Sequence, residues 1–260
     1  MTELVLSEDH GAIRQVVLNR PEKRNAFNGE LVLATGAALR AAADDPAVHC
    51  VVLRGAGPMF SSGMDLGALA ALAEAPESLR AFRRRCIEAW NLAEEMPKPV
   101  ICAIQGACIG GALELALACD FRVLAADAIV GMPETRIGLI PDVGGSSRLP
   151  QLVGLGRAKE LIMTGKLIGA DEAERIGLAT RVAPAEELDS AVQQLAGELL
   201  ACAPVAVALA KRVIDASARP ALAQSLELEV AMQELCARSE DFAEGARAFQ
   251  EKRQPEFVGR

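Results

Sequence analysis

Aromatic residues are scarce in this chain: they make up 3% of its 260 residues, with no tyrosine and a single tryptophan, Trp90. The core must therefore be built from aliphatic side chains, because hydrophobic residues still account for 51% of the sequence. Single-stranded nucleic acids are commonly bound by stacking bases on aromatic rings, and few such platforms exist here. A net charge of −8 also opposes a polyanionic partner over most of the surface. We expect no nucleic-acid partner.

Histidine and cysteine groups of the metal-binding kind are also missing. The two histidines, His10 and His49, lie far apart in the sequence, and the seven cysteines include no CxxC pair. Cys102, Cys108 and Cys119 lie among Ala, Ile and Leu, which is typical of reduced, buried thiols in a cytosolic protein. The sequence therefore predicts neither a metal site nor disulfides.

Long hydrophobic runs are absent as well. The chain has no run of about eighteen consecutive apolar residues, the length at which a membrane span is considered. The segment Met1–Asp9 carries acidic residues and no apolar run, unlike a signal peptide. We expect a cytoplasmic protein with no membrane partner.

Strand-like and helix-like segments alternate up to about Val182, after which helices follow one another. The predicted strands are Leu4–Leu6, Ile13–Leu18, Cys50–Leu53, Val100–Ile104, Phe121–Leu124 and Ala128–Val130. The predicted helices are Gly29–Ala43, Glu77–Glu95, Gly111–Ala118, Ala185–Ala201, Pro204–Ala216, Ala221–Ala237 and Ser239–Arg253. Such alternation predicts an α/β core of right-handed strand–helix turns over residues 1–198. Residues 199–260 are expected to form a helical region that packs onto the core or onto a neighbouring subunit.

Two glycine-containing segments present backbone N–H groups where a strand gives way to a helix. They are Phe60–Asp65 and Gly110–Glu114. Two N–H groups that converge on one oxygen make an oxyanion hole, which stabilises charge developing on a carbonyl. This arrangement predicts an enzyme that polarises a carbonyl group.

Three acidic residues are candidates for proton transfer beside that carbonyl. Glu114 is the only charged residue of the apolar helix Gly111–Ala118, so we expect it to be buried with a raised pKa. The alternative is a first-turn glutamate that interacts with the helix dipole or belongs to a capping box, and the box would need Ser or Thr where Gly111 stands. Glu134 follows a proline, as at a helix start. Asp142 lies in a glycine-rich segment, where it serves either as a turn or cap residue or as a catalytic acid.

Two further patterns give weaker support for a catalytic or binding role. A Ser-His-Asp arrangement would use one of Ser61, Ser62, Ser146 and Ser147, but neither histidine is placed near them by a motif. The run Arg83–Arg85 is expected on a solvated helix face, with phosphate contact as the alternative.

A series of short motifs occurs in one order along the chain. They are Asn19–Pro21 with Asn25–Ala26, Phe60–Asp65, Gly106–Asp120, Pro133–Glu134, Gly138–Pro141, Gly144–Gly145, Arg148–Leu149 and Gly154. In this order they resemble the crotonase (enoyl-CoA hydratase/isomerase) superfamily over essentially the whole chain. The resemblance implies a crotonase-like spiral of ββα turns with a C-terminal helical trimerisation tail. It therefore also implies a homotrimer or a dimer of trimers.

The resemblance further implies roles for individual residues in an acyl-CoA site. The N–H groups of Ser62 and Gly111 form the oxyanion hole for the thioester carbonyl, and Glu114 and Glu134 match the two glutamates that hold and activate water in hydratases. The positions that match CoA contacts are Lys23, Arg24, Ala26, Met64 and Asp65, together with Phe249 and Lys252, which are placed to reach a neighbour's CoA. CoA enters as part of the substrate, and no metal or redox cofactor is implied.

The residues present favour an enoyl-CoA hydratase, which adds water across a trans-2-enoyl-CoA to give a 3-hydroxyacyl-CoA. Asp142 departs from the plain hydratase pattern, since many hydratases have a small residue there and some relatives that shift double bonds have an acid. One alternative is an enoyl- or dienoyl-CoA isomerase that uses Glu134 and Asp142, although dienoyl-CoA isomerases carry an aspartate where Glu114 stands. The other is a scaffold that binds acyl-CoA without turnover, which the retention of both glutamates and both oxyanion positions argues against.

Overall fold

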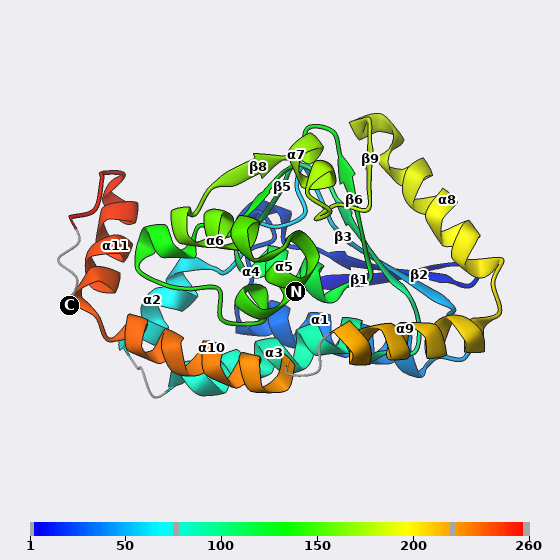
Figure 1. Cartoon of the computed structure of the whole chain (residues 1–260), viewed down its shortest axis with the longest axis horizontal. Coiled ribbons are helices and arrows are strands. Elements are labelled where there is room, and N and C mark those ends of the chain that lie inside the picture. Colours follow the sequence, from blue (N-terminus) through cyan, green and yellow to red (C-terminus); the bar gives the residue numbers. More distant parts are fainter. Residues whose placement is uncertain (1–2, 75–77, 219–221, 257–260) are drawn as a thin grey trace.

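A six-stranded sheet forms the centre of the described part of the chain (Figure 1). The computed structural model describes residues 3–74, 78–218 and 222–256. In sheet order the strands are β1 (Val5–His10), β2 (Ile13–Leu18), β3 (Cys50–Gly55), β4 (Val100–Ile104), β6 (Phe121–Ala125) and β9 (Arg181–Ala183). β1 and β2 pair as an antiparallel hairpin, and every later pair of neighbours in this sheet is parallel.

Helices cover both faces of the parallel strands. β4 is buried throughout and β3 nearly so, which is typical of parallel strands enclosed on two sides. α1 (Gly29–Asp44) packs against β1, β2 and α3 (Leu79–Glu95), whereas α8 (Leu188–Leu200) packs across β3, β4 and β6. Figure 1 shows α8 on one side of these strands and α1 with α3 on the other. The predicted α/β core is confirmed.

A smaller sheet lies beside the first and orders the glycine-containing segments. Its strands are β5 (Ala107–Ile109), β7 (Ile129–Gly131) and β8 (Leu167–Gly169). A bridge between Ser61 and Cys108 joins the loop after β3 to β5. α4 (Gly111–Ala118) begins directly after β5, and the short 3-10 helix η3 (Glu134–Ile137) follows β7. The two segments predicted to present N–H groups are therefore brought together by strand pairing.

Three helices follow α8 in the described part of the chain. They are α9 (Pro204–Ala218), α10 (Leu222–Ala237) and α11 (Glu240–Glu251). α10 packs against α3 and α5 (Gly145–Val153), and α11 packs against η3. Figure 1 shows α9 and α10 along the lower edge and α11 at the left end. These helices match the predicted ones, except that Ala221 lies outside the described residues, and a division at residue 198 stays a prediction.

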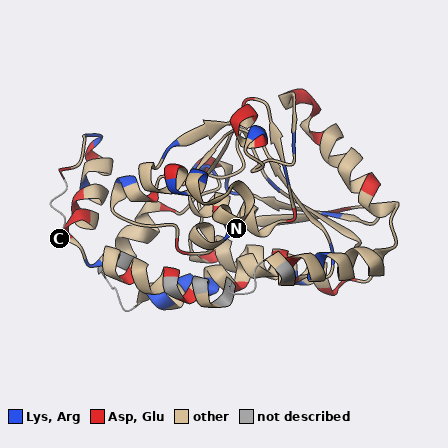
Figure 2. Ribbon diagram, in the orientation of Figure 1, with Lys and Arg blue, Asp and Glu red and all other residues tan. Residues whose placement is uncertain are grey.

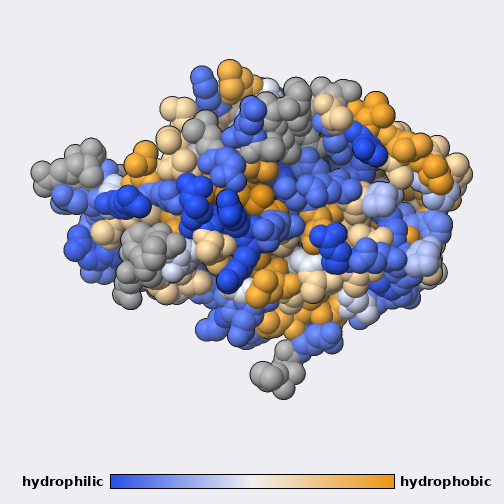
Figure 3. All heavy atoms as spheres, turned by 90° about the horizontal axis from the view of Figure 1, so that it is seen from below, coloured by the Kyte–Doolittle hydropathy of each residue, from blue (hydrophilic) through white to orange (hydrophobic). Residues whose placement is uncertain are grey.

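α9 exposes apolar side chains to solvent. Val205, Leu209 and Val213 are 73%, 56% and 64% exposed, and their spacing of four residues places them along one face. Figure 2 shows acidic and basic residues interspersed along the other helices, α10 among them. Figure 3, seen from the side on which α9 and α10 lie, shows hydrophobic surface toward the right-hand end, where α9 is drawn in Figure 1. In a single chain this face has no covering partner among the described residues.

Four helices of the core were not predicted. They are α2 (Leu66–Glu74), α5, α6 (Leu155–Thr164) and α7 (Ala170–Arg175). α2 has no apolar–polar period in its sequence, and its start is set by Asp65, whose side chain accepts the N–H groups of Gly67 and Ala68. The predicted start of α3 at Glu77 lies outside the described residues. Among the described helices, none is both long and apolar enough to span a bilayer.

The core is aliphatic, as predicted. Its one tryptophan connects α3 to Phe27 and to the start of α4. Trp90 of α3 is fully buried, and its ring lies 5.0 Å from that of Phe27. Its Nε1–H donates to the carbonyl oxygen of Gly111 at 3.2 Å. Trp90 therefore helps to hold the first residue of α4 in place.

Asn25 organises the loop between β2 and α1. Its φ of +52° and that of Arg24 at +56° lie in the left-handed region, which asparagine tolerates better than most residues. The side chain is fully buried, accepts the N–H of Arg20, and donates to the carbonyl oxygens of Ala56, Met59 and Phe60. The loop after β3 is thus attached to the loop after β2.

We predict that Asn25→Ala lowers the free energy of unfolding by about 3 kcal/mol or more, since it leaves several buried backbone groups without partners at about 1–3 kcal/mol each. Asn19→Ala is the matched control, because the Asn19 side chain makes one exposed hydrogen bond, to the Glu3 carbonyl oxygen, and should cost about 1 kcal/mol. Urea denaturation measures both. Equal losses for the two variants would contradict the role given to Asn25.

Candidate active site

The N-terminus of α4 and the loop after β3 approach each other closely. Gly63 has a φ of +93°, and a Cβ on it would lie 2.5 Å from the Ile109 carbonyl oxygen, so this position requires glycine. That Cβ would also lie 3.6 Å from the Gly111 nitrogen, and a Cβ on Gly111 would lie 2.8 Å from the Met64 Cε. Met64 and Gly111 are therefore adjacent where both line one cavity.

The N–H groups of Met64 and Gly111 donate to no acceptor among the described residues. Ser62 differs, because its N–H donates to the Arg24 carbonyl oxygen at 3.0 Å. A donor engaged inside the protein is not free for a ligand. The structure therefore corrects the prediction for Ser62: the unengaged pair beside the cavity is Met64 and Gly111.

Glu114 is buried in α4, as predicted, with 2% of its surface exposed. Its Oε1 accepts the N–H of Val143 at 2.9 Å and that of Gly145 at 2.8 Å. Burial raises the pKa of Glu114, while these two N–H groups and the charge of Arg83 oppose the rise. A Cβ on Gly145 would lie 2.8 Å from the same oxygen, so glycine allows the backbone to come this close.

Glu134 is the first residue of η3 and faces the start of α4. Its Oε1 lies 2.8 Å from the position of a Cβ on Gly110, which has a φ of +57°. Its Oε2 is enclosed and has no hydrogen-bond partner among the described residues. Burial raises the pKa of Glu134 well above its ordinary value, and the nearby charges of Glu114 and Asp142 raise it further. The neutral, protonated form is therefore favoured.

Asp142 forms a buried ion pair with Arg83 of α3. The Arg83 Nε lies 2.6 Å from the Asp142 Oδ2, and the two side chains are 3% and 4% exposed. The prediction of a solvated Arg83 is wrong, although Arg84 and Arg85 are exposed. Asp142 does not cap α5, whose N-cap residue is Gly144. Burial raises the pKa of Asp142 to about 7 against the opposing charge of Arg83.

One cavity of about 770 Å³ joins these groups, a size typical of small-molecule sites. Glu114, Glu134 and Asp142 line it together with the unengaged N–H positions. The predicted CoA contacts in the first part of the chain also line it, namely Lys23, Arg24, Ala26, Met64 and Asp65. Asp65 is in addition paired with Arg20 at 2.8 Å. The structure thus brings the predicted acids and the predicted CoA positions to one cavity.

The last helix differs from the prediction. Phe249 lines the cavity of its own chain, with 55% of its surface exposed, rather than reaching only toward a neighbour. Lys252 ends α11 with a φ of +55° and is not among the described residues that line this cavity. A contact of Lys252 with a neighbour's CoA stays a prediction.

Two residues of α10 hold the loop after η3 and were not predicted as part of the site. The Glu229 carboxylate accepts the N–H of Gly144 at 2.7 Å and the hydroxyl of Ser147, and Gln233 accepts the N–H of Ile140 at 3.0 Å. Burial raises the pKa of Glu229 to about 8, and the charge of Glu114 adds to the rise. The available signal was their i, i+4 spacing, which places both on one helical face.

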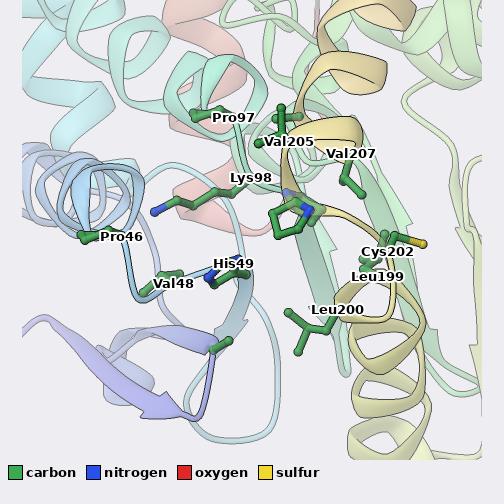
Figure 4. Close-up of a pocket in the computed structure, with 14 residues that line it drawn as sticks. Pro46, Val48, His49, Pro97, Lys98, Leu199, Leu200, Cys202, Val205 and Val207 are labelled. Atoms are coloured by element: carbon green, nitrogen blue, oxygen red, sulfur yellow. The ribbon is translucent and has the colours of Figure 1, made fainter.

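A second cavity, of about 500 Å³, lies between the start of β3, the α3–β4 turn and the α8–α9 connection (Figure 4). His49, Lys98 and Cys202 are its polar lining residues, and no described lining residue carries a carboxylate. The Lys98 amine already donates to the carbonyl oxygens of Ala42 and Asp45. The lining of this cavity therefore supplies neither a carboxylate nor an unengaged amine. Within the described ranges, no group of three or more His, Cys, Asp or Glu side chains is arranged to hold a metal ion.

Known proteins give a consistent comparison. Residues 8–260 match the family profile described as enoyl-CoA hydratase/isomerase. A crotonyl-CoA hydratase from Syntrophomonas wolfei is 38% identical over 259 residues, which cover 99% of both chains. An enoyl-CoA isomerase/hydratase from Mycosarcoma maydis is also 38% identical, over 95% of this chain and 93% of the relative.

Solved structures agree with these sequence matches. An enoyl-CoA hydratase from Mycobacterium avium subsp. paratuberculosis has a TM-score of 0.89 to this chain at 30% identity, and the match covers 98% of both chains. Both the sequence and the fold therefore assign this chain to the enoyl-CoA hydratase/isomerase family.

Proposed function

We propose that this protein is an enoyl-CoA hydratase that converts a trans-2-enoyl-CoA into a 3-hydroxyacyl-CoA. One observation carries the proposal: the carboxyl groups of Glu114, which is buried, and of Glu134, which is half-buried with its Oε2 enclosed, line the same cavity as two unengaged N–H groups. Hydration needs a proton acceptor for water, a proton donor for carbon, and stabilisation of a negative oxygen. The cavity supplies a group for each task.

The thioester oxygen binds between the N–H groups of Met64 and Gly111. As water adds to C3, the electrons of the C2–C3 double bond move toward the thioester, and the oxygen gains negative charge. Preorganised donors in such positions contribute about 2.7–4 kcal/mol each to the transition state. The positive end of α4 lies at Gly111 and acts in the same direction.

The surroundings stabilise the ionised form of Glu114 and the protonated form of Glu134. This difference in protonation assigns their roles. Glu114 accepts two backbone N–H bonds, so its charged form is stabilised and it takes the proton of the attacking water. Glu134 has an unpartnered Oε2 and a strongly raised pKa, so it is protonated and delivers a proton to C2. No metal or redox cofactor is needed, and CoA is held as part of the substrate along the residues from Lys23 to Ala26.

We predict that Glu114→Gln and Glu134→Gln each lower the hydration rate by about 10²–10⁴-fold while CoA-ester binding persists. The wild-type rate should fall at low pH, where Glu114 becomes protonated, and at high pH, where Glu134 loses its proton. Glu114→Gln should remove the acidic limb of this profile and Glu134→Gln the alkaline limb. Glu186→Gln, at an exposed position, is the control. Near wild-type turnover in either site variant would remove that residue from the mechanism.

Isomerisation of the double bond is the second candidate function. The observation that favours it is Asp142, a third buried acid in the cavity with a pKa near 7. The relative from Mycosarcoma maydis carries both activities in its name. In this case Glu134 and Asp142 would move a proton between C2 and C4, and the product would keep the mass of the substrate.

We predict that Asp142→Asn changes hydration by less than about tenfold, because Asp142 transfers no proton in that reaction. If isomerisation is the main activity, the same substitution should cost about 10² or more. Mass analysis of products from a panel of enoyl-CoA thioesters separates the two reactions, since hydration adds the mass of water. A chain that only binds acyl-CoA would leave every thioester unchanged.

A homotrimer, or a dimer of trimers, is the proposed assembly. The exposed apolar face of α9, formed by Val205, Leu209 and Val213, supports it, because such a face is typical of an interaction surface. We predict that Leu209→Glu weakens the oligomer in sedimentation velocity, whereas Leu155→Glu, the same change at another exposed leucine, leaves the trimer intact. A stable wild-type monomer at micromolar concentration would contradict the assembly.

A further inference from the structure

Arg83 is a buried cation beside the acids Glu114, Glu134 and Asp142 of the cavity. The other cations that line the cavity, Lys23, Arg24, Arg136 and Arg253, are exposed. Arg83 is 2% exposed, while Arg84 and Arg85 beside it are exposed, so one member of the run is turned inward. Its Nε lies 2.6 Å from the Asp142 Oδ2 without the alignment of a hydrogen bond, and both atoms lack other partners among the described residues. The contact is therefore mainly electrostatic, and both groups still have unused hydrogen-bonding capacity.

The groups that face Asp142 come from every element packed around it. They are Arg83 and Cys86 from α3, Glu114 from α4, Glu134 from η3, and Glu229 and Cys236 from α10. Arg83 is the cation that pairs directly with Asp142. The other buried cation nearby, Arg148 of α5, pairs with Glu94 and donates to the carbonyl oxygen of Val143. Since the other ionisable groups that face Asp142 are acids or thiols, each of them in its charged form disfavours the carboxylate of Asp142.

The ion pair consequently decides the protonation state of Asp142. Burial and the charge of Glu114 favour the neutral acid, and Arg83 favours the carboxylate. The balance lies near neutral pH, where a modest change in the surroundings converts one form into the other. Without Arg83, only the backbone hydrogen bond of Asp142 would be left among these contributions to oppose burial, and the balance would move toward the protonated acid.

We propose that Arg83 is the positioning residue that keeps Asp142 ionised as a base for C4 of a bound 2-enoyl-CoA. This inference rests on the proposed function in one respect: it assumes that a 2-enoyl-CoA thioester binds in the same cavity. Asp142 directly precedes Val143, whose N–H donates to the Glu114 carboxylate. Because Glu114, the N–H pair and Asp142 line one cavity, we place the acyl chain of a bound substrate along it toward Asp142.

The step is a reversible proton transfer that needs no other reactant. The C4–H bond breaks and its proton goes to the Asp142 carboxylate. The bonding electrons form a C3–C4 double bond, the C2–C3 electrons shift to C1–C2, and the negative charge rests on the thioester oxygen held by Met64 and Gly111. Return of the proton to C4 regenerates the substrate, and protonation at C2 gives the 3-enoyl isomer.

The test is deuterium exchange at C4 of crotonyl-CoA in D₂O, followed by NMR, with hydration measured in parallel. Exchange at C4 requires the carboxylate of Asp142, so Arg83→Gln should slow it by about tenfold or more at pH 7 and shift its pH dependence upward. Hydration should fall less, because Glu114 keeps its two backbone N–H bonds. Arg83→Lys keeps the charge and should retain most of the exchange with the wild-type pH profile.

Two controls separate this role from a structural one. Arg84→Gln removes a neighbouring exposed charge and should leave exchange and hydration unchanged. Asp142→Asn should abolish exchange, and adding Arg83→Gln to it should have no further effect on that reaction.

Several outcomes would overturn the inference. They are equal losses of exchange and hydration in Arg83→Gln with an unmoved pH profile, Arg83→Lys as slow as Arg83→Gln, and exchange that survives Asp142→Asn. Hydration without any C4 exchange in the wild type would reject this inference and leave the proposed hydratase standing. Exchange at C4 without hydration would reject the proposed hydratase and leave this inference standing.

Discussion

The carboxylate of Glu114 and the two backbone N–H groups that bind it are the interaction on which the site depends. Glu114 is the only charged residue of a buried apolar helix, and such a charge is costly unless it is hydrogen-bonded. The N–H groups of Val143 and Gly145 supply those bonds, so the loop after η3 must lie against α4. The same loop contains Asp142, which lines the cavity. The hydrogen bonds to Glu114 therefore also help to position Asp142.

Helix α10 also binds this loop, and so contacts the segment that lies against Glu114. Three successive N–H groups point to two glutamates: those of residues 143 and 145 go to Glu114, and that of Gly144 goes to Glu229 of α10. Residues 142–144 form a turn in which Gly144 has a φ of +115°, and two elements hold this turn through neighbouring N–H groups. The position of α10 therefore bears on the geometry around Glu114.

Crowding of acids in one enclosed cavity gives each a different protonation preference. Glu114 is stabilised as a carboxylate by N–H groups, Glu134 is left without a partner for one oxygen, and Asp142 is balanced by Arg83. Separated preferences of this kind distinguish a proton acceptor from a proton donor. The buried cation Arg83 is thus as informative about the chemistry as the acids, because its charge opposes the effect of burial on Asp142.

What the sequence determined by itself is local. The apolar runs of β2, β4 and α4 predicted those elements at their observed bounds, and an acid within the α4 run predicted a buried Glu114. Tertiary structure decided the rest. The direction of the Ser62 N–H depends on the left-handed turn at Arg24, and the burial of Arg83 depends on Asp142, 59 positions away by their numbers in the chain. Neither outcome has a local signal, because hydrogen bonds and ion pairs between distant segments exist only once the segments have packed.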